Sequence, residues 1–389
     1  MADEFVAGAL PEIDRTPGYA LFLALASLPG AAFAAFVQVI LSALSVVLVA
    51  RLAQAAFPDK RIALAAAWIF AFEPVSVIYS VRLTPETLFV ALLLLSLERI
   101  AVFLRERRLR ALLAGGLWLA AAVFVRPVGY YLIFALAVGL LVALIRVPGL
   151  RWKAPVVLLA AVLPWLAAWQ ARNWVETGFG GFSSIVARNL YFYEAAEVAA
   201  RAEDRPFAEV QSDFGYGDKR SYIARHPEQA AWSEARRTAF MAAEAARIVG
   251  GHSGIALRMY IEGAAVVAFT PSAAELLRLT GAWPQGWPAS VIDRGPVRSA
   301  LWMLRAQPGV AALMAALEAV LLFFYVLVLR GAKRMGARNA QLWLLAGVAL
   351  YFFAVSGGTQ AVGRYRLPAM PEVCVLAGAG WPRKRMSEV

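Results

Sequence analysis

The segment Ala32–Ala53 reads AFAAFVQVILSALSVVLVARLA, and Arg51 is its single charged residue. A helix that crosses the hydrocarbon core of a bilayer needs about 20 mostly apolar residues. The segment meets this requirement and therefore predicts a transmembrane helix. Other segments along the chain repeat the pattern.

The composition extends this prediction to the whole chain. Of the 389 residues, 61% are hydrophobic and 16% are charged, whereas soluble domains have about 45–50% and about 25%. The excess is too large for one buried core, because a folded surface needs polar cover. This argues against a soluble enzyme, a disordered chain and a coiled coil. We predict an all-α polytopic membrane protein with spans near Ala32–Ala53, Ile62–Tyr79, Glu86–Leu104, Ala111–Val125, Val128–Ile145, Ala154–Ala171, Val310–Leu329, Gln341–Val355 and Leu367–Trp381.

Basic residues between these spans predict the orientation. The formal net charge is +12, and the basic clusters fall on one side if the spans alternate. By the positive-inside rule this side is the cytoplasm, so we expect a multi-pass protein of the inner or plasma membrane. At Arg126-Pro127 the pattern allows either a turn or one long kinked helix. The clusters are Arg51–Arg61, Arg105–Arg110, Arg146–Lys153, Arg330–Arg338 and Arg383–Arg385.

The chain divides into three predicted parts. Residues 1–176 form an N-terminal transmembrane core with outer loops, residues 177–308 an extracytoplasmic soluble or interfacial segment, and residues 309–389 the C-terminal transmembrane helices. The middle part has mixed charge and lacks an adequate span.

Two stretches of the middle part carry helical patterns. Arg220–Ile248 predicts a soluble amphipathic helix or a helix pair. Ile255–Phe269 is apolar but short, and Arg258 and Glu262 interrupt it, so we predict an interfacial helix. Three prolines beyond it indicate a loop, namely Pro284, Pro288 and Pro296.

Arginines on the predicted outer side run against the positive-inside bias. They are Arg126, Arg172, Arg364 and Arg366. A charge at membrane depth is costly and often functional, and the guanidinium fork binds phosphate well. The alternative is that these side chains extend to the outer headgroups. Because several converge on one face, we favour an anionic ligand, with a lipid phosphate as the natural one.

Carboxylates on the same side are candidates for acid–base chemistry. Asp3 and Glu4 form a pair that could hold a general base or a cation, although exposed acids near termini are common. In Thr84-Pro85-Glu86, Thr84 is a predicted N-cap, with Pro85 at the first helical position. A capped helix with a carboxylate favoured by the macrodipole explains Glu86 equally well.

The region before the first predicted span has two further features. Met1 is followed at once by acidic residues without a preceding span or a basic signal region, so we expect a further helix upstream. Arg15-Thr-Pro-Gly-Tyr19 precedes an apolar run too short to span. This predicts a half-helix at the outer interface, or alternatively a lipid anchor with Tyr19 in the aromatic belt.

The sequence shows few residues of the types that bind metals or cofactors. One cysteine excludes a disulfide framework or a cysteine-based zinc site, and two histidines exclude a His-rich metal centre. Phosphate-binding glycine loops and nucleophile elbows are absent from the sequence. We expect no cofactor, although a divalent metal remains possible, and no nucleic-acid partner.

The order of these motifs resembles the bacterial glycosyltransferases of family 39. This is the protein-mannosyltransferase-like group with the GT-C fold, to which the lipid A aminoarabinose transferases are related. The resemblance rests on the acidic pair, Arg15-Thr-Pro-Gly-Tyr19-Ala-Leu-Phe, Thr84-Pro85-Glu86-Thr-Leu, Val125-Arg126-Pro127, Arg172-Asn-Trp and Gly363-Arg364-Tyr365-Arg366-Leu-Pro. It covers nearly the whole chain in order.

The resemblance implies a GT-C helix bundle whose active site faces the outside. Such enzymes take a sugar from a polyprenyl-phosphate carrier and pass it to a lipid, glycan or protein acceptor, usually with inversion. A carboxylate in the first outer loop acts as general base. The motif falls here at Asp3 and Glu4, which makes Asp3 the expected base.

The other expected roles follow from the chemistry of the transfer. Arginines would stabilise the departing lipid phosphate without a metal, and they are Arg126, Arg172, Arg364 and Arg366. Glu86 is a further catalytic candidate, and Arg15, Tyr19 and Tyr365 would line the acceptor or sugar cavity. The prenyl tail would lie between helices, among the membrane lipids.

Two other functions remain open. One is a transporter or flippase of an amphiphilic anion, and the other is an O-antigen ligase or polymerase. Transporters more often show internal repeats and broken helices at the midplane, neither of which we identify in the sequence. An acidic residue facing the outer arginines across one cavity would favour transfer, whereas a two-sided central pathway would favour transport.

Overall fold

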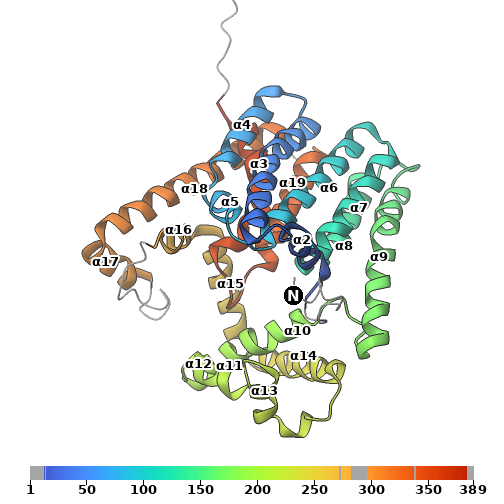
Figure 1. Ribbon diagram of the computed structural model, residues 1–389. Helices are drawn as coiled ribbons and strands as arrows, with labels where there is room; N and C mark the ends of the chain where they lie inside the picture. The colour runs from blue at the N-terminus through green and yellow to red at the C-terminus, as the bar shows by residue number, and fades with distance from the viewer. Residues whose placement is uncertain (1–12, 14, 271–272, 282–295, 337–338, 383–389) are drawn as a thin grey trace, which may run out of the picture.

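The structure is a computed structural model that describes residue 13 and residues 15–270, 273–281, 296–336 and 339–382. Within these ranges the regular elements are all helices (Figure 1). The prediction of an all-α polytopic membrane chain is confirmed for the described residues. Each predicted span corresponds to a helix or to a pair of helices.

The N-terminal half forms most of an apolar bundle (Figure 1). In the core of this bundle α3 packs on α6 and α4, and α7 packs on α6 and α9. The α6 helix is largely buried, because 72% of its apolar window lies inside the protein. The elements are α2 (Pro17–Ala26), α3 (Ala31–Ala56), α4 (Lys60–Ala71), α5 (Pro74–Ser80), α6 (Glu86–Glu106), α7 (Leu109–Val125), η1 (Pro127–Gly129), α8 (Leu132–Ala143) and α9 (Lys153–Thr177).

The C-terminal helices complete the bundle. They are α18 (Pro308–Met335), α19 (Ala340–Val355), the 3₁₀ segment η5 (Gly363–Ala369) and α20 (Met370–Gly380). Every residue of α20 is buried. It lies very close to α18, because a Cβ on Gly331 would meet the carbonyl of Leu376 and one on Gly380 would meet the carbonyl of Leu327. Small residues allow such close approach of helices in a membrane.

Among the residues that the structure describes, four helices are long and apolar enough to cross a membrane, namely α3, α6, α9 and α18. The pair α4 and α5 passes the same test but is bent by 59°. The first helix ends at Ala71, and Glu73 caps the second, where its carboxylate accepts hydrogen bonds from the amides of Val75 and Ser76 at 3.1 and 2.7 Å. Pro74 starts α5, a position that suits proline. A broken helix is therefore present, although we identified none from the sequence.

The alternative left open at Arg126-Pro127 is decided in favour of a turn. The α7 helix ends at Val125 and Arg126 adopts an extended conformation. This is the conformation preferred before proline, and η1 then leads into α8.

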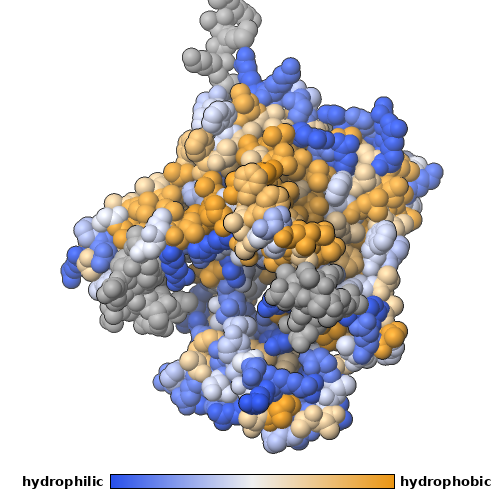
Figure 2. Space-filling model, in the orientation of Figure 1, coloured by the Kyte–Doolittle hydropathy of each residue, from blue (hydrophilic) through white to orange (hydrophobic). Residues whose placement is uncertain are grey.

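A polar lobe follows the end of α9, and we define it as residues 185–251. It consists of α10 (Ile185–Asn189), the π-helical segment η2 (Leu190–Ala195), α11 (Ala196–Glu203), α12 (Phe207–Asp213), α13 (Lys219–Arg225), η3 (Pro227–Gln229) and α14 (Glu234–Gly251). Figure 2 shows that the surface of the lobe is largely hydrophilic, whereas the bundle carries a broad hydrophobic surface. The predicted helix pair within 220–248 is confirmed as α13 and α14.

Within the described ranges, three helices lie along the chain between the lobe and the C-terminal part of the bundle. They are α15 (Ser253–Phe269), α16 (Ala273–Leu279) and α17 (Pro296–Ala306). The α15 helix runs from the lobe to the bundle in Figure 1, and it packs on η5, α18 and α19. The prediction of a loop at Pro284 and Pro288 lies outside the described residues, and Pro296 begins α17.

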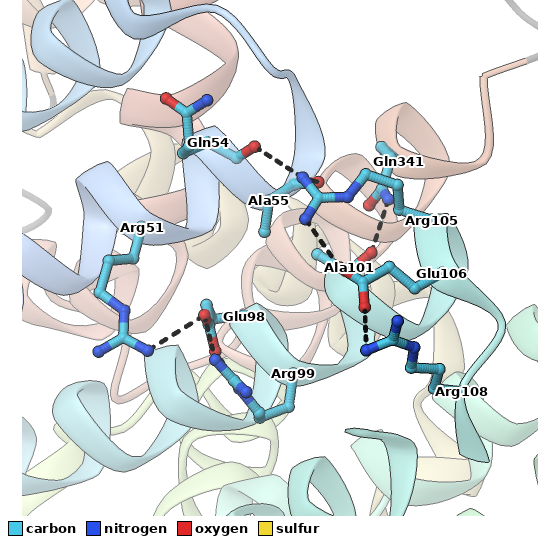
Figure 3. A network of polar contacts seen from close by, with 10 residues as sticks. All are labelled: Arg51, Gln54, Ala55, Glu98, Arg99, Ala101, Arg105, Glu106, Arg108 and Gln341. Atoms are coloured by element: carbon cyan, nitrogen blue, oxygen red, sulfur yellow. Dashed lines mark hydrogen bonds and ion pairs between the residues drawn. The ribbon is translucent and has the colours of Figure 1, made fainter. Parts of the chain in front are cut away.

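Arginine and glutamine side chains join the C-terminal parts of α3 and α6 to the start of α19, and Figure 3 shows these contacts from close by. Arg105 donates from Nη1 to the carbonyls of Gln54 and Ala55 at 3.2 and 3.4 Å, which are carbonyls left free at the end of α3. Gln341 of α19 donates from Nε2 to the carbonyl of Ala101 at 2.9 Å. These bonds tie α3, α6 and α19 together.

Candidate active site

A buried acid–base pair lies at the lobe end of α6 and α7. Glu86 is the first residue of α6 and is 3% exposed. Arg126 follows the last residue of α7, and its Nη1 lies 3.5 Å from Glu86 Oε1. The guanidinium also lies over the ring of Phe89, with 5.8 Å from Cζ to the ring centroid. The sequence motifs around Glu86 and Arg126 thus meet in one place.

Thr84 does not cap α6, contrary to our prediction. Pro85 takes the N-cap position with φ −70° and ψ −9°, and no side chain caps the helix. Thr84 therefore lies one residue too far from the free amides of the first turn to accept from them. Its hydroxyl is buried and has no hydrogen-bond partner among the described residues.

Arg364 of η5, a segment that packs on α6, lies within the electrostatic influence of Glu86. Its Nη2 donates to Tyr365 Oη at 3.3 Å, and its guanidinium lies 5.0 Å from the centroid of that ring. Burial lowers the pKa of Arg364, but the hydrogen bond to Tyr365 and the charges of Glu86 and Tyr79 raise it more. The pKa of Arg364 is therefore above its ordinary value, and the group stays cationic beside Glu86.

Four buried polar atoms at this place have no hydrogen-bond partner among the described residues. They are Thr84 Oγ1, Glu86 Oε2, Arg126 Nη1 and Arg364 Nε. We call these four residues the Glu86 cluster. Buried polar groups are nearly always paired, and exceptions often mark a functional site. The cluster has two guanidinium groups against one carboxylate, which suits one additional negative charge.

A second layer of polar contacts surrounds the Glu86 cluster. Tyr19 donates from Oη to Gln38 Oε1 at 2.7 Å, and the amide of Gln38 donates to the carbonyl of Arg82. Arg82 is held by Glu275 of α16 through a 2.7 Å contact between Nη1 and Oε2. Burial and the charge of Glu86 raise the pKa of Tyr19, so its hydroxyl stays protonated.

Our sequence analysis missed Arg82, Gln38 and Glu275. A signal existed for Arg82, because it is another arginine on the predicted outer side, between the second and third predicted spans. Gln38 is the amide nearest the outer end of Ala32–Ala53. No sequence pattern pointed to Glu275, because only the tertiary structure places α16 next to Arg82.

An apolar groove opens beside the cluster. It has a volume of about 470 Å³ and lies between α2, α6, α7 and α9. Leu88 follows Glu86 by two residues, Val125 precedes Arg126 and Gly18 precedes Tyr19, so the groove begins next to the charged groups. The lining residues are Gly18, Leu88, Leu92, Leu117, Ala120, Ala121, Phe124, Val125 and Trp165.

The remaining predicted site residues lie elsewhere or have other partners. Arg366 is 3% exposed and donates from Nη1 to the carbonyls of Val267 and Thr270 at 3.2 and 2.7 Å. Arg172 pairs with Glu176 on its own helix, α9. These contacts hold both arginines against other parts of the fold, so we do not place them in the Glu86 cluster.

The N-terminal candidates are described only in part. Arg15 is exposed just before α2, and Asp3 and Glu4 lie outside the described residues. Tyr365 is adjacent to the Glu86 cluster through its bond with Arg364. No group of three or more His, Cys, Asp or Glu side chains within the described ranges is arranged to hold a metal ion.

The lobe reaches the segment that carries Arg364. Glu194 of η2 accepts a hydrogen bond from the amide of Thr359 at 2.9 Å, and Tyr260 of α15 donates to the carbonyl of Ala354 at 2.6 Å. Gly358 has φ +103°, a conformation that favours glycine, and a Cβ there would also collide with Glu194. These contacts fix the segment before η5, and with it the position of Arg364.

Known structures of similar shape are oligosaccharyltransferases from Archaeoglobus fulgidus. One, tethered to an acceptor peptide, has 13% identity and a TM-score of 0.49, covering 95% of this chain and 41% of that one. The enzyme AglB in complex with an inhibitory peptide and a dolichol-phosphate gives the same identity and score, covering 94% and 42%. The chain thus spans about two fifths of the length of these structures. At this identity and score the likeness carries no activity or substrate over to this chain.

Comparison with protein families gives a match within the N-terminal half. No curated protein matches the chain. Residues 15–169 match the family of dolichyl-phosphate-mannose-protein mannosyltransferases. This range contains Tyr19, Glu86 and Arg126, and it confirms the resemblance inferred from the motifs. Over residues 15–169 the chain is thus similar to the dolichyl-phosphate-mannose-protein mannosyltransferases, and its apolar helices make it a multi-pass membrane protein.

Proposed function

We propose that this protein is a membrane glycosyltransferase that moves a sugar from a polyprenyl-phosphate carrier to a lipid, glycan or protein acceptor. Transfer takes place at the lobe end of the bundle, on the extracytoplasmic side, with inversion. The observation that carries the proposal is the Glu86 cluster, in which buried cationic groups with unused hydrogen-bonding atoms lie beside an apolar groove.

The charge of the cluster suits the donor. A sugar linked to polyprenyl phosphate through a phosphodiester carries one negative charge, which would balance Arg126 and Arg364 against Glu86. Guanidinium groups in a buried site hold phosphate through short, charge-assisted hydrogen bonds. The adjacent groove would receive the first part of the prenyl chain, because its lining is apolar.

The reaction requires a base and a stabilised leaving group. The base takes the proton of the acceptor hydroxyl while its oxygen attacks the anomeric carbon from the face opposite the carrier. The bond from that carbon to the phosphate oxygen breaks, and the electron pair leaves with polyprenyl phosphate. Arg126 and Arg364 stabilise the charge that develops on this phosphate.

We propose Asp3 as the base, with Glu4 as its neighbour and Glu86 as the next candidate. Glu86 Oε1 lies 3.5 Å from Arg126 Nη1, so the main role of Glu86 is to orient that guanidinium. Tyr19, Tyr365 and Arg15 stay candidates for the wall of the sugar and acceptor cavity.

The test is transfer of radiolabel from a polyprenyl-phosphate-linked sugar in membranes that contain the protein. The Asp3→Asn variant should lose about 10²–10⁴-fold in transfer, the usual contribution of general-base catalysis, and should still bind the donor. Full activity in this variant would remove Asp3 from the mechanism. Label that crosses the membrane without transfer to any acceptor would instead indicate a transporter, and label transferred only from a preassembled polymer would indicate a ligase.

A further inference from the structure

A second group of charges lies in the C-terminal parts of α3 and α6, at the other end of α6 from the Glu86 cluster, and Figure 3 shows it from close by. Arg51 of α3 places Nη2 at 3.3 Å from Oε1 of Glu98 on α6. Arg99, the next residue of α6, donates from Nε and Nη2 to both oxygens of the same carboxylate. We call Arg51, Glu98 and Arg99 the triad.

The triad lies one to two helical turns inside the last residues of α3 and α6. Glu98 precedes the last residue of α6, Glu106, by eight residues, and Arg51 precedes the last residue of α3, Ala56, by five. At the rise of an α-helix these separations correspond to about 12 Å and about 8 Å. Charges at such depth are costly and need a partner.

The triad has an excess of one positive charge. The side chain of Glu98 is 7% exposed, whereas those of Arg51 and Arg99 are 52% and 34% exposed. The carboxylate is thus buried and the two guanidinium groups reach the protein surface. Because Arg51 uses a single nitrogen on Glu98, the rest of its fork can bind an anion.

The positive-inside rule accounts for the side on which Arg51 lies but not for its pairing with a buried carboxylate inside the helix. The neighbouring Arg105 lies at the end of α6, where it donates to the carbonyls at the end of α3 and pairs with Glu106 at 3.2 Å. The contacts of Arg105 therefore stabilise the helix ends. Arg51 lies further inside its helix and has N–H groups that do not contact Glu98.

An apolar stripe on α3 leads to the triad. Ile40, Leu44 and Val47 lie on the same face as Arg51, since their spacing follows the helical repeat. Their exposed fractions are 42%, 50% and 55%. In a membrane-spanning helix such residues face lipid. A stripe of this kind beside a cation matches an acyl chain attached to a charged headgroup.

We propose that the triad binds the phosphate of an anionic phospholipid in the leaflet opposite the lobe, with an acyl chain along Ile40, Leu44 and Val47. Basic pockets between transmembrane helices recognise anionic headgroups in this way. The site is separate from the Glu86 cluster, so the test of this proposal does not depend on the proposed function.

Native mass spectrometry of the purified full chain tests the proposal, with phosphatidylglycerol and phosphatidylcholine as probes. The wild-type protein should retain phosphatidylglycerol in preference to phosphatidylcholine, and millimolar inorganic phosphate should not displace it. Arg51→Gln should weaken retention by about five-fold or more, the loss of one charge-assisted contact. Arg330→Gln, an equal charge change at an exposed residue of α18, is the matched control and should have no effect.

A variant with the opposite expectation separates lipid binding from a structural role. Glu98→Gln removes the carboxylate that offsets the two arginines, so retention of phosphatidylglycerol should increase. If Arg51→Gln fails to fold, the double variant with Glu98→Gln should bind more weakly than Glu98→Gln alone. Equal retention of both lipids, displacement by inorganic phosphate, or equal effects of Arg51→Gln and Arg330→Gln would overturn the proposal.

Discussion

Arg126 Nη1 lies 3.5 Å from Glu86 Oε1, and neither that nitrogen nor the second oxygen of Glu86 has a hydrogen-bond partner within the described part of the chain. The pair joins the start of α6 to the end of α7 at a buried position. A fully satisfied ion pair would serve the fold alone. A loose pair with spare donor and acceptor atoms is instead suited to receive a ligand.

Replacing Glu86 by Gln should lower transfer more than donor binding. The amide keeps the shape of the side chain, but Arg126 loses the charge that orients it. We expect transfer to fall by about 10-fold or more, while binding of polyprenyl phosphate stays equal or becomes tighter because the cluster gains net positive charge. Turnover and polyprenyl-phosphate affinity, measured side by side, check this. Glu176→Gln, which removes the partner of Arg172 on α9, is the control. Weaker lipid binding in Glu86→Gln would contradict the assigned role.

Replacing Arg126 or Arg364 by Gln should weaken donor binding. Each change removes a charge-assisted contact to phosphate, worth about 1.5–3 kcal/mol, which corresponds to an affinity loss of about 10-fold or more. The measurement is the dissociation constant of polyprenyl phosphate. Arg172→Gln and Arg366→Gln have the same chemistry outside the cluster and should keep the wild-type affinity. Equal losses in all four variants would show that the effect is not local.

Gly18 should tolerate no side chain. A Cβ there would lie 2.6 Å from the carbonyl oxygen of Phe124 and 2.9 Å from the amide of Val125, and both are backbone atoms that cannot turn aside. We expect Gly18→Ala to destabilise the protein by about 1–3 kcal/mol through overpacking. It should also weaken donor binding, since Gly18 lines the groove. The midpoint of thermal unfolding in detergent measures the first effect.

Gly139 supplies the control for this substitution. It lies in α8 with no atom within 4 Å of an added Cβ. Gly139→Ala should therefore leave stability unchanged or raise it by about 0.5–1 kcal/mol through the helix preference of alanine. A similar loss in both variants would show that the packing of α2 on α7 is not the cause.

The contact between α11 and α15 should depend on pH. Glu262 accepts from Arg201 at 2.9 Å and from Arg258 at 2.8 Å, and the hydrogen bond from Arg201 is the main reason why the pKa of Glu262 is below its ordinary value. A lowered pKa means that the stabilisation is present above the ordinary pKa and is lost as pH falls through the folded pKa. The melting temperature of the wild type should thus exceed that of Glu262→Gln at pH 7. The difference should start to shrink as pH falls below the ordinary pKa of a glutamate and should vanish only below the lowered pKa of the folded state. A difference independent of pH would exclude the ion pairs as its cause.

Much of the helical architecture was predictable, because lipid imposes a simple rule on sequence. Apolar segments such as Ala32–Ala53 must form helices in the bilayer, since each peptide group needs an internal hydrogen bond. Spans therefore follow from composition and length. The turn at Arg126 and the break at Glu73 were harder, because they depend on local competition between proline, capping and tertiary contacts.

The candidate site was predictable in part. Glu86, Arg126 and Arg364 were singled out because charge near lipid is costly and needs a reason. Thr84, expected to cap α6, lies outside the helix instead, and Arg366 donates to carbonyls of the α15 region. Residue type and predicted side of the membrane are identical for Arg364 and Arg366, so only their direction in η5 separates them.

The sequence by itself determined that this is a helical membrane chain, because hydropathy is a local property, and its ordered motifs gave the resemblance to the protein mannosyltransferases that the match over residues 15–169 supports. Only the tertiary structure decided which charged residues meet. Glu86 and Arg364 are separated by more than half of the chain, and α16 and the lobe each contribute contacts near them. The pairing of such residues depends on how helices pack, and packing is determined by the whole set of interhelical contacts rather than by any one segment.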